Sequence, residues 1–112
     1  MVKKFPKRGE IYWGNLEPTI GAETKKLRPC LVLSNNIGNE ISGVVIIAPI
    51  TSNIKNIYPF EVAISIDKKK AKAMINQCRA VDKSRLGDLL GKVDIETMKC
   101  IDKAIKLVFS IT

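Results

Sequence analysis

The chain has 112 residues, of which 46% are hydrophobic and 27% are charged, and this composition excludes wholesale disorder. The length suffices for one core and is too short for two, so residues 1–112 are expected to form a single domain. Nineteen Lys and Arg against eleven Asp and Glu give a net charge of +8, which favours a polyanionic partner, although a merely lysine-rich protein would show the same balance.

The chain contains no histidine, which excludes the commonest general acid–base residue and the commonest metal ligand. Cys30, Cys78 and Cys100 are widely spaced, which favours buried thiols in a reducing cytoplasm over a zinc site or a disulfide framework. The basic N-terminus has no apolar run behind it, and the longest apolar run, residues 44–50, is far too short to span a membrane. We therefore expect a cytoplasmic protein that makes no membrane contact.

The first half of the chain predicts strands separated by one long polar loop. Residues 10–16 are rich in aromatic and β-branched side chains and predict a strand, which Pro18 ends. Residues 19–28 form a lysine-bearing loop, and Pro29 biases Arg28 to an extended conformation at the entrance of a second strand, residues 30–34. Residues 35–39 have the composition of a turn.

The second half continues with short strands. The apolar run at residues 44–49 predicts a central strand, and two hydroxyl residues, Thr51 and Ser52, follow it directly. Residues 59–66 alternate cleanly between apolar and polar side chains, as a half-buried strand does. Residues 67–72 predict a lysine-rich turn or short helix, residues 73–81 a further strand, residues 84–90 a segment compatible with a helical turn, and residues 91–93 a short last strand.

The chain ends in a predicted amphipathic helix. Asp94 is a candidate N-cap, and apolar side chains then recur every three or four residues over residues 95–108. Five or six short strands closed by one terminal amphipathic helix predict a mainly β fold, for which we favour a small SH3-like antiparallel barrel.

Short motifs along this chain resemble those of the MazF/PemK family of bacterial toxins. The resemblance covers residues 7–109 and depends on the order and spacing of the pieces, because each piece alone is weak. The residues that carry it are Arg8-Gly9-Glu10, Pro18, Gly21, Glu23, Arg28-Pro29, Val32, Ser34-Asn35, Pro49-Ile50-Thr51-Ser52, Gln77, Arg79, Val81-Asp82, Arg85-Leu86 and Gly91.

The resemblance implies a homodimeric toxin of a type II toxin–antitoxin pair with the barrel of the plasmid-maintenance toxin type. It implies an endoribonuclease that needs no metal and no cofactor and cuts single-stranded RNA at short sequences, which blocks translation. The 2′-hydroxyl attack it implies leaves a 2′,3′-cyclic phosphate and a 5′-hydroxyl end. The implied partners are messenger RNA and a cognate antitoxin whose disordered tail folds on binding, with operator DNA bound only through the antitoxin complex.

The same resemblance implies roles for individual residues. By position, Arg28 matches the family's catalytic arginine, Thr51 its catalytic threonine, and Gln77 a glutamine that positions substrate. Many members carry a carboxylate directly before that glutamine, whereas this chain has Asn76. The identity of the general base is therefore left open by the resemblance.

Chemistry gives each of these residues an alternative. Arg28 suits a phosphorane through its paired N–H donors, but it is otherwise a strand-edge surface arginine. Thr51 and Ser52 are otherwise turn residues, and Asn76 and Gln77, which can read base edges, are otherwise bonded within the sheet.

The remaining candidates lie around the loop and the lysine-rich segment. Glu23, Lys25 and Lys26 are expected to gate and steer RNA from the loop, with a solvated surface as the alternative. The lysines at 68, 69, 70 and 72 either attract phosphates or form a solvated turn. Trp13 is expected in the core, with base stacking as its alternative.

Two other functions compete with RNA cleavage. The same barrel type serves a toxin that binds DNA gyrase and cuts nothing, and fold alone does not separate that function from a nuclease. A basic RNA-binding module with a degraded site is the third possibility, which Asn76 leaves open.

Overall fold

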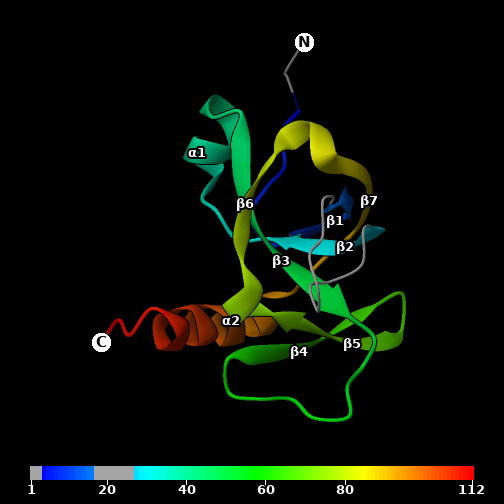
Figure 1. Ribbon diagram of the computed structural model, residues 1–112, viewed down its shortest axis with the longest axis vertical. Helices are drawn as coiled ribbons and strands as arrows, with labels where there is room; N and C mark the ends of the chain where they lie inside the picture. The colour runs from blue at the N-terminus through cyan, green and yellow to red at the C-terminus, as the bar shows by residue number, and fades with distance from the viewer. Residues whose placement is uncertain (1–3, 17–26) are drawn as a thin grey trace.

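A curled antiparallel sheet and one long C-terminal helix make up the described part of the chain (Figure 1). The computed structural model describes residues 4–16 and 27–112. The strands in this part are β1 (Glu10–Asn15), β2 (Leu27–Val32), β3 (Val44–Thr51), β4 (Glu61–Ile66), β5 (Lys69–Met74), β6 (Arg79–Asp82) and β7 (Leu86–Lys92). The helices are α1 (Asn36–Ile41), α2 (Ile95–Val108) and the short 3₁₀ turns η1 (Ile75–Gln77) and η2 (Lys83–Arg85).

The sheet runs in the order β4-β5-β3-β2-β1-β7, and β6 pairs with β3 off this path. β3 is the longest strand, and it is shared: Val44 to Ile47 pair with β6, whereas Ile50 and Thr51 pair with β5. β3 therefore joins the β6 side of the sheet to the β5 side, and Thr51 is its last residue.

Alternation along the strands divides the core into two clusters. Leu31 and Ile50 belong to a large cluster that also contains Ile101 and Ala104 of α2. The strand neighbours of Leu31, Cys30 and Val32, belong to a second cluster. Because successive side chains of a strand point to opposite faces, β2 serves both clusters at once.

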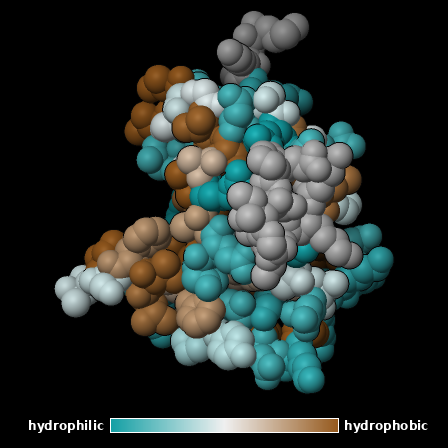
Figure 2. All heavy atoms as spheres, viewed as in Figure 1, coloured by the Kyte–Doolittle hydropathy of each residue, from teal (hydrophilic) through white to brown (hydrophobic). Residues whose placement is uncertain are grey.

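The helix α2 covers one side of the sheet, as its apolar spacing predicts. The Asp94 side chain accepts a hydrogen bond from the Thr97 backbone N–H at 2.8 Å, which caps the first turn. Ile101 is fully buried against the sheet, and Figure 2 shows apolar side chains gathered over this C-terminal part of the chain. In the described residues, no helix combines the length and the apolar character needed to cross a membrane.

Several predicted elements are confirmed and others are wrong. The mainly β fold with a C-terminal amphipathic helix is confirmed, as are the first strand and the alternation of residues 61–66. The predicted turn at residues 35–39 is wrong, because Asn35 caps the short helix α1. The lysine-rich segment is a turn only at its start. Asp67 and Lys68, both at positive φ, form a tight hairpin turn, but β5 begins at Lys69, so the turn or short helix predicted for the rest of residues 67–72 is wrong.

The strand boundaries after β5 also differ from the prediction. The single strand predicted over residues 73–81 is interrupted by η1, so that its two ends belong to β5 and β6. The helical turn expected within residues 84–90 is reduced to η2, and β7 then runs without a break from Leu86 to Lys92. The chain therefore turns sharply at η1 and reaches β3 a second time through β6.

Candidate active site

Arg28 and Thr51 lie on one face of the sheet, at the ends of neighbouring strands. Cys30 pairs with Pro49 across β2 and β3, so the same register carries Arg28, two residues before Cys30, toward Thr51, two residues after Pro49. On either side, Gly14 of β1 is the partner of Arg28, and β5 supplies the partner of Thr51. The antiparallel pairing therefore brings residues from four strands into one row.

The Arg28 guanidinium is held but not fully paired. Its Nη1 donates a hydrogen bond of 3.1 Å to the carbonyl oxygen of Ile50, while its Nε is buried and has no partner among the described residues. Burial lowers the pKa of Arg28, and the nearby Cys30 opposes this shift. Arginine still keeps its proton in proteins, so the group is a cation with donors left over for a ligand.

Two small residues, Cys30 and Gly14, pack closely against each other beside the arginine. The Cys30 thiol is fully buried and donates a hydrogen bond of 3.4 Å to the Arg28 carbonyl oxygen. Burial raises the pKa of Cys30 to about 12, against the opposing charges of Arg28 and Arg79, so the group is a neutral thiol rather than a nucleophile at neutral pH. A Cβ at position 14 would lie 2.5 Å from the Cys30 sulfur, which explains glycine there.

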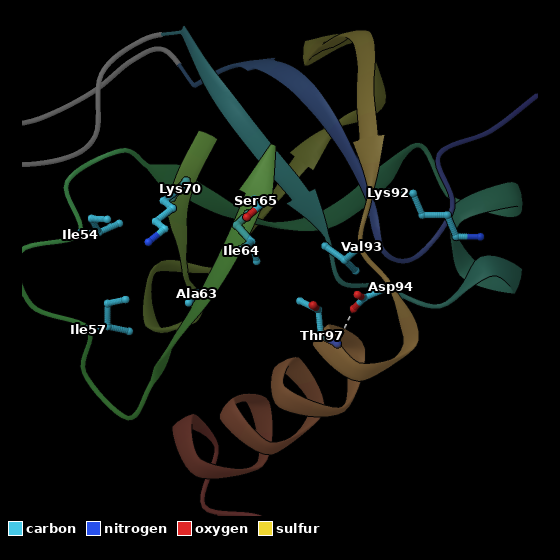
Figure 3. A pocket seen from close by; sticks show the side chains of 11 residues that line it. Ile54, Ile57, Ala63, Ile64, Ser65, Lys70, Lys92, Val93, Asp94 and Thr97 are labelled. Atoms are coloured by element: carbon cyan, nitrogen blue, oxygen red, sulfur yellow. Dashed lines mark hydrogen bonds between the residues drawn. The ribbon is translucent and has the colours of Figure 1, made fainter. Parts of the chain in front are cut away.

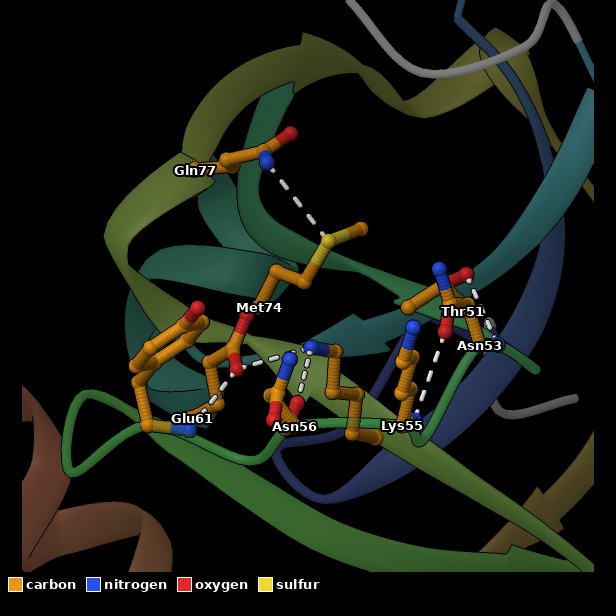
Figure 4. Close-up of polar contacts among 9 residues, drawn as sticks. Thr51, Asn53, Lys55, Asn56, Glu61, Met74 and Gln77 are labelled. Atoms are coloured by element: carbon orange, nitrogen blue, oxygen red, sulfur yellow. Dashed lines mark hydrogen bonds and ion pairs between the residues drawn. The ribbon is translucent and has the colours of Figure 1, made fainter.

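The Thr51 hydroxyl keeps its proton available. Its Oγ1 accepts a hydrogen bond of 3.2 Å from the Asn53 backbone N–H, as drawn in Figure 4. A hydroxyl that already accepts one bond can still donate its own proton. Thr51 is half-buried and lines the same pocket as Arg28.

A pocket of about 590 Å³ joins these residues to an apolar wall. Arg28, Thr51 and Ser52 line it together, as the sequence predicts for one site. Trp13 lines the same pocket and is 38% exposed, so the expectation that it lies in the core is wrong. Trp13 pairs with Pro29 and therefore lies on the opposite face of the β1–β2 pair from Arg28, although both residues line the pocket.

Sequence reasoning missed part of the pocket. Lys69 and Lys70 line it, which supports one of the two readings of the lysine-rich segment, but Lys72 does not and is buried elsewhere. The lining residues that were not predicted include Leu27, Ile66, Asp67 and Leu90. Only proximity in the sequence pointed to three of them, since Leu27 precedes Arg28, and Ile66 and Asp67 precede the lysine run. No sequence signal pointed to Leu90.

The other predicted residues lie apart from this pocket. Asn76 and Gln77 are exposed on the 3₁₀ turn η1 and do not line it. Gln77 Nε2 donates to the Met74 sulfur at 3.5 Å, and Figure 4 shows the Met74 side chain between Gln77 and Thr51 in that view. Glu23, Lys25 and Lys26 lie outside the described residues.

A second pocket of about 600 Å³ contains neither Arg28 nor Thr51, and Lys70 is the one described candidate residue that lines it. It lies between β4, the segment that carries Ile54 and Ile57, and the start of α2 at Asp94 and Thr97 (Figure 3). Elsewhere in residues 4–16 and 27–112, no three Cys, Asp or Glu side chains are close enough together to hold a metal ion. The strand-end pocket is therefore the place where the predicted chemistry gathers.

Comparison with known proteins identifies the family. Residues 7–109 match the family model described as PemK-like, MazF-like toxin of type II toxin–antitoxin system. The chain is 35% identical over 107 residues to endoribonuclease EndoA of Bacillus subtilis, covering 90% of this chain and 91% of that protein. It is 34% identical over 110 residues to endoribonuclease MazF9 of Mycobacterium tuberculosis, covering 90% and 93%.

Solved structures of the same fold agree. MazF from Deinococcus radiodurans superposes with a TM-score of 0.83 at 27% identity, covering 96% of this chain and 99% of that one. An endoribonuclease from a mycobacterial species, solved in complex with its cognate antitoxin, gives a TM-score of 0.81 at 25% identity over 96% and 97%. The chain belongs to the family of PemK-like, MazF-like toxins of type II toxin–antitoxin systems.

Proposed function

We propose that residues 1–112 form a single toxin domain that acts in the cytoplasm as an endoribonuclease, cutting single-stranded RNA at short sequences and thereby inhibiting translation. The observation that carries the proposal is the meeting of Arg28 and Thr51 in one pocket at the ends of β2 and β3. The relatives named endoribonuclease support it, because 35% of the aligned residues are identical in EndoA.

The reaction needs charge stabilisation more than covalent chemistry. The ribose 2′-hydroxyl attacks the adjacent phosphorus and loses its proton, the bond to the 5′-oxygen breaks, and that oxygen takes up a proton. The products are a 2′,3′-cyclic phosphate and a 5′-hydroxyl. Negative charge builds up on the phosphoryl oxygens meanwhile, and the free N–H groups of Arg28 are suited to bind them.

Thr51 is placed for a second role. Its Oγ1 accepts a hydrogen bond from the Asn53 backbone N–H, and this bond leaves the hydroxyl proton for donation to a ligand. We assign it a hydrogen bond to the phosphate or to the leaving 5′-oxygen. Asn76 cannot act as a general base, since an amide has no proton-accepting group of useful pKa.

Substrate binding follows from charge and shape. Lys69 and Lys70 add positive charge at the rim of the pocket, which attracts the RNA backbone. Ser52 lines the same pocket and offers a hydroxyl, and the exposed amides of Asn76 and Gln77, outside the pocket, are suited to contact bases farther along the RNA. The loop residues Glu23, Lys25 and Lys26 remain candidates for gating.

The partners are a second copy of the chain and a cognate antitoxin. Exposed apolar side chains on β3 and at the C-terminal end of α2, among them Ile46, Leu107 and Phe109, offer surface that a second copy can cover. A relative of this fold was solved with its cognate antitoxin, which supports an antitoxin partner for this chain. Light scattering of the purified protein measures the dimer directly, and a monomer at micromolar concentration would contradict it.

The proposed activity is tested by incubating the purified protein with a long RNA and mapping the 5′-hydroxyl ends. Discrete ends that share a short sequence are expected, and added EDTA should leave the cleavage unchanged because no metal is assigned a role. Intact RNA together with inhibited gyrase would favour the non-cleaving toxin. Intact but bound RNA would favour an RNA-binding module.

A further inference from the structure

We propose that Lys72 is a positioning residue for RNA cleavage, and that its buried ion pair with Glu61 fixes the segment that follows Thr51. The inference rests on the proposed function and concerns how the site keeps its shape. Lys72 is the cross-strand partner of Thr51, so it extends the row of Arg28 and Thr51 onto β5.

The lysine is buried and fully engaged. The residue is 8% exposed, and its Nζ donates a hydrogen bond of 2.9 Å to Glu61 Oε1 and another of 2.7 Å to the Asn56 carbonyl oxygen. Nζ also lies 5.7 Å from the centre of the Tyr58 ring. The ammonium therefore has partners in three directions and is not free to meet a phosphate.

These contacts anchor the chain between β3 and β4. Glu61 Oε1 also accepts a hydrogen bond of 3.0 Å from the Tyr58 backbone N–H, so one carboxylate and one ammonium hold both Asn56 and Tyr58 (Figure 4 draws the Asn56 and Glu61 contacts). The same segment reaches Thr51 at its other end, where the Asn53 backbone N–H donates to the threonine hydroxyl. A displacement at Asn56 would thus be transmitted over three residues to the Asn53–Thr51 hydrogen bond.

The Lys72–Glu61 ion pair is expected to fix geometry more than to add stability. A buried ion pair loses much of its attraction to desolvation, and an apolar pair of similar volume is often as stable. What a charged pair adds is direction, because its hydrogen bonds fix where the partner groups lie. The sequence alternative of a phosphate-attracting Lys72 is not supported by these contacts, whereas Lys69 and Lys70 line the pocket itself.

The test compares two neutralised ion pairs. In the double variant Lys72→Met/Glu61→Gln no buried charge is left unpaired. The amide introduced at position 61 can still accept from the Tyr58 backbone N–H, but the bond to Asn56 is lost. The matched control is Lys99→Met/Glu96→Gln, which neutralises an exposed pair on α2 with a 3.4 Å contact. Lys72→Arg, which keeps the charge and the N–H donors, is the conservative variant.

Three quantities are measured on each protein: the single-turnover rate at saturating RNA, the Kd for RNA blocked by 2′-O-methylation, and amide exchange at Asn53 and Tyr58. For the buried double variant we expect the rate to fall about 10- to 100-fold, as a small misplacement of a reacting group does. Its Kd and the salt dependence of that Kd should not change, and exchange at Asn53 should speed up. Lys72→Arg should recover most of the rate, and the control pair should match the unaltered protein.

An unchanged rate in a folded double variant would overturn the proposal. A weaker Kd with a smaller salt dependence, at an unchanged saturating rate, would also overturn it, because Lys72 would then be a phosphate contact. If the double variant does not fold, Glu61→Gln alone takes its place, because it keeps Lys72 and neutralises its partner. Slowed cleavage with faster Asn53 exchange in that variant supports the proposal, and unaltered values oppose it. If the unaltered protein and the control pair cut no RNA, the proposed function fails, while amide exchange still shows whether the ion pair holds the segment.

Discussion

The side of the sheet covered by α2 and the pocket at the ends of β2 and β3 differ in how well their side chains are buried and paired. Under α2, Ile101 and Ala104 are buried and the first turn of the helix is capped. At the strand ends, Trp13 and Leu27 are 38% and 62% exposed, and a buried nitrogen of Arg28 has no partner among the described residues. Exposed apolar surface and an unpaired donor both cost stability, so the pocket is the part of the molecule that a ligand would complete.

The largest expected effect comes from removing the unpaired cation. Arg28→Ala should lower the cleavage rate about 10²- to 10³-fold, because a preorganised donor to the developing charge is lost. The fold should remain, since the guanidinium holds the described chain only through its hydrogen bond to Ile50. The cleavage rate is measured on an RNA with a mapped cleavage site, and the fold is checked by a thermal melt. Arg28→Lys keeps the charge but not the paired donors, so its cleavage rate should lie between those of the unaltered protein and Arg28→Ala. Cleavage at the normal rate by Arg28→Ala would show that the arginine has no part in the mechanism.

The apolar wall of the pocket should matter for binding. Trp13→Ala is expected to weaken affinity for uncleavable RNA by about 1–3 kcal/mol, the range for loss of a stacked base. Trp13→Phe should retain most of the affinity, and Ile37→Ala, at a 75% exposed position on α1, is the control. Trp13 is the only tryptophan of the chain, so its fluorescence reports RNA at this pocket directly. Binding with neither a fluorescence change nor an effect of Trp13→Ala would place RNA elsewhere.

A substitution in the core packed against α2 should lower stability and leave the cleavage rate unchanged. Ile101→Val removes one buried methyl group and should lower the free energy of unfolding by about 0.5–1.5 kcal/mol. The cleavage rate of the folded protein should stay the same, because Ile101 lies in the cluster beneath α2 and does not line the strand-end pocket. Chemical denaturation gives the stability. A marked loss of rate at unchanged RNA affinity would show that the two regions are coupled.

The last expected effect appears only outside the neutral range and is a loss of stability at high pH. Burial raises the pKa of Cys30 to about 12, above the ordinary thiol value of about 8.5. The unfolded chain therefore releases this proton first, so stability is fully present below about pH 8.5 and falls as the pH rises toward 12. Denaturation curves between about pH 8 and 11 should show the decline, with the same sign from Tyr12, whose pKa burial raises to about 12. Cys30→Ala should reduce the slope, whereas Cys100→Ala, at an exposed position, should not alter it.

Local patterns predicted much of the fold. The helix at residues 95–108 follows from its apolar spacing and from Asp94, and the strand at residues 61–66 follows from its alternation. The short helix after Asn35 was missed because asparagine and glycine are common to turns and to helix starts. The start of β5 was missed because its first residues are lysines, and its strand geometry depends on pairing with β4 rather than on composition.

The site was predictable only where one residue constrains its neighbour. Pro29 places Arg28 in an extended strand, and Thr51 is the last residue of a mostly buried strand, so both positions could be found from the sequence. Trp13 and Lys72 were misplaced because their environments depend on which strands pair. The first is exposed at the strand ends, and the second is buried by groups that lie 11 and 16 residues away in the chain.

The central claim is that Arg28 serves an attack by the ribose 2′-hydroxyl at the strand-end pocket. The most direct test uses an oligonucleotide with the mapped cleavage sequence in which only the sugar before the scissile phosphate keeps its 2′-hydroxyl. We predict that the unaltered protein converts it to a 2′,3′-cyclic phosphate and a 5′-hydroxyl fragment, identified by mass spectrometry, and that Arg28→Ala does so at least about 100-fold more slowly. Cleavage of the matching oligonucleotide that lacks this hydroxyl, or an unchanged rate for Arg28→Ala, would contradict the account.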